Sequence, residues 1–345
     1  MATTTDGLAF DHSGSDAAEH LLEVRDLGVE FRTRHGLVQA VNGLSYSLDP
    51  SQTLAILGES GSGKTVSAHA VMGIIDSPPG YVTGGQVVYR GVDLLRLPER
   101  QMRRIRGQRI AMIFQDALAA LNPVFTVGFQ IAEMFRVHRG MRRQDARARA
   151  AELMDRVRIP NARRRLDDYP HQFSGGMRQR VMIAMALALD PDILIADEPT
   201  TALDVTVQAQ IMQLLADLQE QTGMGMILIT HDLGVVAEVA DEVVVMYAGR
   251  AMERGPIHDV YAQPAHPYTL GLMRSIPRAD HKGRRLDPIP GQPPNLARIP
   301  PGCEFHPRCP YARDVCVERR PPLFDVDSGR ASACHFYEEI LNRDG

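Results

Sequence analysis

The sequence lacks tryptophan and has almost no lysine: among 38 Lys and Arg residues, only Lys64 and Lys282 are lysines. A position that keeps lysine in an arginine-preferring chain is therefore a candidate for a specific role. The sequence also lacks a long apolar run. Its longest candidate, Val181 to Leu189, ends at Asp190 and Pro191, well short of the about 18 residues that a bilayer requires. We therefore expect no membrane-spanning segment.

An excess of one charge sign is also absent. The 42 acidic and 38 basic side chains give a formal net charge of -4, so no global positive field attracts nucleic acid or anionic lipid. The Arg-rich stretch 136–165 is interpreted as a solvated helix face, with contact to anionic headgroups or nucleic acid as the alternatives. Residues 1–20 contain no Lys or Arg, which excludes the charge pattern of a secretory or mitochondrial leader and predicts a cytosolic protein.

Cysteine is scarce and confined to the C-terminal end. Thiols in a reducing cytosol do not form stable disulfides, whereas four clustered thiolates suit a tetrahedral sulfur site or an iron-sulfur cluster. Zinc ribbons usually carry a tight C-x2-C pair, which is absent here, so the wider spacing favours [4Fe-4S], with zinc and no metal as alternatives. His306 and His335 keep mixed ligation open. The candidate ligands are Cys303, Cys309, Cys316 and Cys334.

The residue composition and the apolar periodicity change along the chain, and its 345 residues suffice for about two domains. Residues 1–20 show no apolar periodicity and predict a mobile leader. Short Val-, Leu- and Tyr-rich runs predict strands over 21–88, and helical spacing predicts helices over about 94–190. Strands then alternate with helices, which indicates a parallel sheet. Six prolines within 288–301 predict an extended linker before the cysteines.

The octet GESGSGKT fits G-x-x-x-x-G-K-[ST], follows the apolar run TLAIL and opens a segment that predicts helix. Glycines let successive backbone N–H groups face phosphate oxygens at a helix N-terminus. Lys64 would reach the β and γ phosphates, and Thr65 would offer its hydroxyl to Mg²⁺. Because one of the two lysines lies where the motif requires it, we interpret the octet as a phosphate loop rather than a flexible turn. Its residues are Gly58, Glu59, Ser60, Gly61, Ser62, Gly63, Lys64 and Thr65.

Two acids, Asp197 and Glu198, end the apolar run ILIA. In open α/β sheets ligands bind at the carboxyl ends of strands. Asp197 is expected to hold Mg²⁺, and Glu198 to polarise the attacking water, a role worth about 10² to 10⁴ in rate. Together with the glycine loop, this pair predicts a P-loop nucleotide hydrolase.

Four further segments follow in a fixed order: Gln115 after IAMIF, the sequence FSGGM from Phe173, ALD ending at Asp204, and His231 after MILIT. They resemble the Q-loop, signature, D-loop and H-loop of ABC-type ATPase domains. The signature usually reads LSGGQ, and Phe173 and Met177 depart from it here. The resemblance covers about residues 21–268.

This resemblance implies an α/β fold, a P-loop NTPase (RecA-like) core with a strand-rich N-terminal subdomain, a helical signature subdomain and a small Cys-bearing C-terminal extension. It divides the chain into a leader at 1–20, an ABC-type ATPase domain at 21–270 with its helical subdomain at about 94–190, and a Pro-rich linker with the extension at 271–345. A non-catalytic regulatory module would require a degenerate Glu198 or His231, and both are intact.

In this family the signature of one subunit closes over the nucleotide on the P-loop of the other, so each active site is composite. The catalytic residues that the resemblance implies are Glu198, His231 and Gln115. Those implied for Mg²⁺ are Thr65, Gln115 and Asp197. Those implied for ATP, besides the glycine loop, are Ser174, Gly175, Gly176, Asp204 and, for adenine stacking, Phe31, whose alternative is a core strand residue.

The segments AHPYT from Ala265, the proline run, and GCEFHPRC ending at Cys309 resemble the C-terminal extension of ATPase subunits of oligopeptide and dipeptide ABC importers. That group includes nickel and glutathione systems. FSGGMRQRVMIAMAL resembles one of the two non-identical ATPase subunits that these importers use. The implied cofactors are ATP, Mg²⁺ and one [4Fe-4S] cluster, with Zn²⁺ as the alternative.

The sequence therefore predicts an ATP-binding and ATP-hydrolysing subunit that powers an importer of di- or oligopeptides. Its expected place is the cytoplasmic face of the bacterial cell membrane, as a peripheral protein. Its expected partners are a second, non-identical ABC ATPase subunit, two transmembrane permease subunits and a periplasmic or extracellular solute-binding protein, and nucleic acid is not among them. The alternative is a soluble ABC ATPase that acts on DNA or in iron-sulfur assembly.

Overall fold

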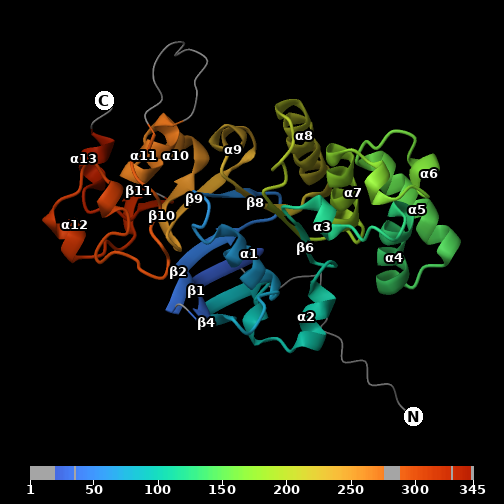
Figure 1. The fold of residues 1–345 in the computed structure, drawn as a ribbon, viewed down its shortest axis with the longest axis horizontal. Helices are drawn as coiled ribbons and strands as arrows, with labels where there is room; N and C mark the ends of the chain where they lie inside the picture. Colours follow the sequence, from blue (N-terminus) through green and yellow to red (C-terminus); the bar gives the residue numbers. More distant parts are fainter. Residues whose placement is uncertain (1–19, 35, 276–287, 328, 343–345) are drawn as a thin grey trace.

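The computed structural model describes residues 20–34, 36–275, 288–327 and 329–342. The leader predicted at 1–20 lies outside the described residues except for His20, and so do residues 276–287 of the predicted linker. Figure 1 shows the N-terminal strands below, the helices α4 to α7 on the right and the C-terminal elements on the left.

An antiparallel sheet with the order β2-β1-β4-β5 forms the first layer. Its strands are β1 (Leu22–Thr33), β2 (Gly36–Leu48), β4 (Gly80–Tyr89) and β5 (Val92–Asp93). The runs LVQAV and LSYSL belong to one strand, β2, which pairs with β1 along its whole length. Val24, Leu27 and Val29 of β1 are buried in one cluster with Ala68 and Val71 of α1 (Lys64–Met72). This layer is the strand-rich subdomain that the sequence predicts.

An eight-stranded sheet with the order β11-β12-β10-β9-β3-β8-β7-β6 forms the second layer. Its strands are β3 (Thr53–Leu57), β6 (Ile110–Ile113), β7 (Ile193–Asp197), β8 (Gly225–Thr230), β9 (Glu242–Tyr247), β10 (Arg250–Pro256), β11 (Phe324–Asp327) and β12 (Arg330–Ser332). The five strands from β9 to β6 pair in parallel. Every residue of β3, β6, β7 and β8 is buried, because helices or strands cover both faces. The parallel pairing brings the ends of β3 and β7 to the same edge.

A helical layer packs in a second hydrophobic cluster, which includes Leu194 of β7 and Leu228 of β8. Its helices are α3 (Ala117–Ala120), α4 (Val127–Arg139), α5 (Arg143–Arg156), α6 (Ala162–Arg165), α7 (Gly175–Leu187) and α8 (Val205–Thr222), with a 3-10 turn at Pro170–Gln172. α4 begins at Thr126, whose Oγ1 accepts a hydrogen bond from the Phe129 N–H, and ends at Gly140 in the left-handed conformation. Its buried face, which includes Ile131 and Phe135, packs on that cluster.

The predicted helical stretch 94–190 is divided between layers. A 3-10 turn (Leu94–Arg96) and α2 (Glu99–Ile105) precede β6, and Met102 and Ile105 pack in the cluster beneath the first sheet. β6 itself joins the second sheet beside β7. The helices that pack with one another therefore begin at α3, which follows β6.

The C-terminal residues complete the second sheet. After α9 (Leu233–Val239), α10 (Ile257–Ala262) and α11 (Pro267–Arg274), the described linker residues from Pro288 to Pro301 form no helix or strand, as the prolines predict. The tail adds β11 and β12 beside β10, with a 3-10 turn (His306–Arg308), α12 (Asp314–Glu318) and α13 (Tyr337–Leu341). Phe305 packs edge-on against Tyr247 with centroids 5.3 Å apart, so the tail shares the core.

Candidate nucleotide-binding site

The glycine loop joins β3 to α1 and fits closely against its neighbours. Gly58 and Gly63 have φ angles of 152° and 100°, which side-chain-bearing residues rarely adopt. A Cβ at Gly58 would lie 2.2 Å from Met246 O, and one at Gly63 would lie 2.2 Å from Ala40 O. Gly63 is also the N-cap of α1 and provides no side-chain cap, so the first N–H groups of the helix remain available to an anion.

Lys64 is only 5% exposed, and its Nζ donates to the carbonyl oxygens of Gly58 at 2.8 Å and Glu59 at 3.0 Å. Burial lowers the pKa of the Lys64 ammonium, while the Glu198 carboxylate acts in the opposite direction. Ser62 Oγ is buried and makes no hydrogen bond within the described chain. A cation held by neutral acceptors and an orphaned hydroxyl both fit a phosphate group.

Thr65 and Asp197 meet at the ends of α1 and β7, where Thr65 Oγ1 donates to Asp197 Oδ1 at 3.1 Å. Asp197 is 2% exposed, and burial raises the pKa of its carboxyl group. A hydroxyl and a carboxylate at one point are hard oxygen donors, which Mg²⁺ prefers. The pair therefore fits the magnesium site that the sequence predicts.

Glu198 directly follows Asp197, and its backbone adopts a left-handed φ of 44°. Its Oε2 accepts hydrogen bonds from Gln115 Nε2 and Thr201 Oγ1, both at 2.9 Å, and His231 Nδ1 lies 3.5 Å from its Oε1. Residues from two distant segments, together with the neighbouring Thr201, thus converge on one carboxylate. The sequence did not predict Thr201, although its position three residues after Glu198 was the available signal.

The signature residues lie elsewhere, at the start of α7, which Figure 1 shows to one side of α1. Ser174 caps this helix through the Met177 N–H, and Ser174 and Gly175 are exposed. Asp204 caps α8 in the same way, with its Oδ1 2.9 Å from Val207 N. No hydrogen bond or ion pair within the described ranges joins these signature and D-loop residues to the glycine loop. Within one chain, the structure leaves them apart.

The chain was compared with known proteins on this basis. The family model described as "ABC transporter" matches residues 41–201, and the one described as "Oligopeptide/dipeptide transporter, C-terminal region" matches 252–316. The oligopeptide transport ATP-binding protein OppD of Salmonella typhimurium is 52% identical over 325 residues, which cover 94% of this chain and 96% of that protein. The chain belongs to the ABC transporter family.

Other relatives agree with this assignment. A protein of Brucella melitensis, whose name assigns it to peptide import as an ATP-binding protein, is 50% identical over 331 residues, 93% of this chain and 98% of its own. A dimeric ATP-binding cassette solved in a post-hydrolysis state with ADP and phosphate has a TM-score of 0.61 and 26% identity, covering 68% of this ABC ATPase and 98% of that chain. These likenesses confirm the predicted fold.

Phe31 occupies a strand position in the ABC ATPase. It is half-buried in β1, packs on the cluster beneath the first sheet, and its ring would lie 2.9 Å from a Cβ at Gly80 of β4. These contacts are those of the core strand residue that the sequence offered as the alternative.

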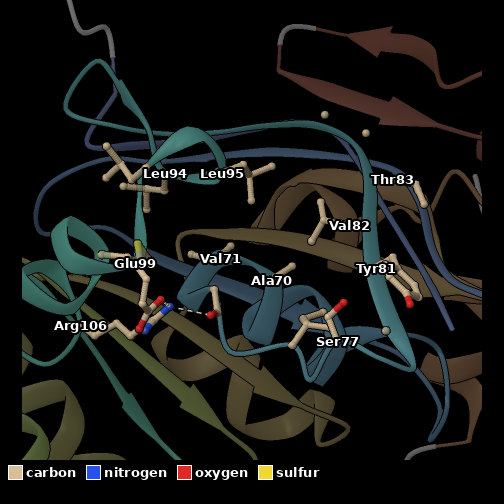
Figure 2. Close-up of a pocket in the computed structure, with 17 residues that line it drawn as sticks. Ala70, Val71, Ser77, Tyr81, Val82, Thr83, Leu94, Leu95, Glu99 and Arg106 are labelled. Atoms are coloured by element: carbon tan, nitrogen blue, oxygen red, sulfur yellow. Dashed lines mark hydrogen bonds and ion pairs between the residues drawn. The ribbon is translucent and has the colours of Figure 1, made fainter.

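Two cavities lie near the nucleotide elements of the ABC ATPase. One of about 430 Å³ is lined by His231, Thr201 and Leu203, so the H-loop and D-loop share it. Another of about 580 Å³ lies behind α1, between that helix, β4 and α2 (Figure 2). Its charged groups satisfy one another, since Arg106 pairs with Glu99 and donates to backbone carbonyls. No residue of the glycine loop lines this second cavity.

All four cysteines of the ABC ATPase line one small cavity with His306, His335, Phe305 and Phe336. Burial raises the pKa of the Cys303 and Cys334 thiols to about 12. Both imidazoles contact backbone carbonyl oxygens, His306 that of Cys303 and His335 that of Arg319. Within the described residues, no group of three or more His, Cys, Asp or Glu side chains is arranged to hold a metal ion. Among all the residues that the structure describes, no helix is both long and apolar enough to cross a bilayer.

Proposed function

We propose that this ABC ATPase powers the import of dipeptides or oligopeptides. The observation that carries the proposal is the tail, which matches the C-terminal region of oligopeptide and dipeptide transporters. The names of the relatives point to peptide import and oligopeptide transport. The alternative, a soluble ATPase acting on DNA or in iron-sulfur assembly, is not favoured because the match includes this tail. The division into an ATPase domain at 21–270 and an extension at 271–345 stays a prediction.

In this proposal each converging side chain has one role in ATP hydrolysis. The glycine loop and Lys64 bind the β and γ phosphates, and Thr65, Asp197 and Gln115 hold Mg²⁺, which when bound neutralises phosphate charge. Glu198 accepts the proton of the attacking water, and His231 contacts the γ phosphate. Gln115 and Thr201 orient the Glu198 carboxylate through their hydrogen bonds. For Phe31 and adenine, the family resemblance is the only support.

A partner subunit supplies the rest of the site. Ser174 and Gly175 are exposed at the positive end of α7, where a hydroxyl and free N–H groups suit a phosphate on another chain. Gly176 packs closely on Val207 of α8, because a Cβ added at Gly176 would lie 2.6 Å from Val207 Cγ1. The start of α7 and the start of α8, which Asp204 caps, therefore form one surface. We propose that a second, non-identical ABC ATPase covers this surface.

The permease partners require a docking surface of their own. Large apolar side chains are unusually exposed around α3 and the start of α4, immediately after β6. Phe125 and Phe129 stack with centroids 4.8 Å apart. These residues flank Gln115, so a bound membrane subunit would contact a segment whose glutamine donates to Glu198. The exposed apolar residues are Phe114, Leu118, Val124, Phe125 and Phe129.

Affinity purification from membranes of the source bacterium tests the assembly. We expect two permease subunits and a second ABC ATPase to co-elute, which would place the chain at the cytoplasmic face of the membrane. Leu118→Asp should reduce the yield of permeases, whereas Val137→Asp, on the far end of α4 and also exposed, should not. Elution with nucleic acid, or with no membrane protein, would contradict the proposal.

We also propose one [4Fe-4S] cluster on the four cysteines, with zinc as the alternative. The support is that all four thiols line one cavity, and that the other residues that line it are histidines, prolines, phenylalanines and a tyrosine. The cysteine spacing, which lacks a tight C-x2-C pair, is the reason for preferring the cluster over zinc. Its role would be to hold together the turns of the tail.

Elemental analysis of anaerobically purified protein distinguishes these possibilities. The cluster predicts brown protein with about four irons per chain and visible absorption that is lost in air. One zinc per chain would replace the cluster by a zinc site. Protein prepared in this way without metal would contradict both.

A further inference from the structure

The tail reaches the glycine loop through one arginine. Arg308 donates to both carboxylate oxygens of Glu59, at 2.6 Å from Nη1 and 3.0 Å from Nη2. Its Nε donates to Pro290 O at 2.8 Å, and Nη1 also lies 3.3 Å from Tyr247 Oη. The Arg308 side chain is 5% exposed, against 26% for Glu59. The buried Arg308 guanidinium, with all three of its nitrogens hydrogen-bonded, fixes the orientation of the Glu59 carboxylate.

A second contact holds the same loop residue by its backbone. The Glu59 N–H donates to Tyr268 Oη at 2.9 Å. Tyr268 is fully buried, and its ring packs on Phe305 of the tail with centroids 5.3 Å apart. Phe305 and Arg308 lie on one short segment between Cys303 and Cys309, so both contacts depend on the fold of the cysteine-bearing turn.

Both contacts act on the part of the loop that positions Lys64. The Lys64 ammonium donates to the carbonyl oxygens of Gly58 and Glu59, so a shift of these peptides moves its acceptors. The Glu59 carboxylate also belongs to the glycine loop, which is proposed to bind phosphate, and an unpaired negative charge there would repel the phosphate groups of a nucleotide. Arg308 offsets that charge while it fixes the backbone.

We propose that Arg308 is a positioning residue for the nucleotide loop, through which the cysteine tail holds Glu59 and the acceptors of Lys64 in the conformation that binds nucleotide. The inference rests on the proposed binding of nucleotide by the glycine loop. It makes the tail a determinant of nucleotide affinity.

Titration with magnesium and a fluorescent N-methylanthraniloyl ADP tests this in the full chain. We expect Arg308→Gln to weaken binding about tenfold, within the usual range of coupling between sites. Arg320→Gln is the matched control, because Arg320 is also a tail arginine and pairs with the buried Glu304 at 2.8 Å. Its affinity should equal that of the wild type. Equal losses in both variants would show a general defect of the tail and overturn the proposal.

A double-mutant cycle tests the path through Glu59. In a Glu59→Gln background, Arg308→Gln should cause little further loss of nucleotide affinity, because the Arg308 guanidinium then has no Glu59 carboxylate to orient. An undiminished further loss, or unchanged affinity of Arg308→Gln in the wild-type background, would overturn the inference. The melting temperature without nucleotide, measured for each variant, separates loss of positioning from loss of folding. Failure of the wild type itself to bind would instead refute the proposed function.

Discussion

At the scale of single residues, Lys64 and Glu198 depend on different environments. Lys64 is buried and its ammonium donates to the carbonyl oxygens of Gly58 and Glu59, while the Glu198 carboxylate acts on it through space. Glu198 sits in a left-handed backbone conformation with two hydrogen-bond donors and His231 around its carboxylate. We propose that the first environment favours nucleotide binding and that the second orients a general base.

Replacing Lys64 should therefore weaken nucleotide binding strongly. Lys64→Ala removes the only lysine of the loop and leaves the carbonyls of Gly58 and Glu59 without their donor. We expect nucleotide affinity to fall by more than tenfold, as is usual when a buried charge partner is lost. Nucleotide titration measures the effect, and Arg313→Ala, an exposed tail variant, serves as the control. Wild-type affinity in Lys64→Ala would contradict the assignment.

Replacing Glu198 should separate binding from turnover. Glu198→Gln preserves shape and can still accept from Thr201, but it cannot take a proton from water. Steady-state ATPase assays on the assembled complex should show turnover about 10² to 10⁴ lower, with nucleotide affinity retained. Wild-type turnover would remove Glu198 from the catalytic role.

At the scale of elements, parallel strands were the most predictable. β3, β7 and β8 are continuous apolar runs because both faces are covered, and each ends directly at its motif. β11 and β12 could not be predicted, because FDVD and RAS are too short and polar to show a period. The pair between Arg308 and Glu59 joins positions 249 residues apart, and no local pattern encodes such a contact.

The start of β9 carries a pH-sensitive carboxyl group. Burial, with Asp241 nearby, raises the pKa of Glu242 to about 7, and Arg254 acts in the opposite direction. Since the folded-state pKa exceeds the unfolded one, the protonated form stabilises the fold at acid pH, and this contribution is lost as the pH rises through about 7. Glu242→Gln mimics the protonated form.

Thermal unfolding of the two proteins between pH 5 and 8 checks this effect. We expect the variant to gain stability over the wild type as the pH rises, on the order of 1 kcal/mol at pH 8. Other titrating groups are common to both proteins and cancel in the difference. A stability difference that stays constant or falls with pH would show that the carboxyl group ionises freely in the fold.

At the scale of the whole molecule, the nucleotide loop and the signature face different surfaces of one chain. We therefore propose that one copy provides two incomplete halves of a site. We expect the isolated chain to be a poor ATPase whose specific activity rises with the concentration of its partner subunit. Activity measured across a dilution series, with the association state followed by light scattering, checks this. Full activity from a chain shown to be monomeric would contradict the composite site.

The two tail strands also close an edge of the large sheet. β12 pairs with β10 through Glu253 and Arg254, and the outermost strand, β11, is short and exposes Asp325 and Asp327. A chain truncated before β11 would expose the edge of β10 that pairs with β12, although its other edge still pairs with β9, and an unprotected edge is a template for pairing with other chains. We therefore expect the acidic strand β11 to protect this edge from aggregation. Chains truncated before β11 should precipitate even where their nucleotide motifs are intact.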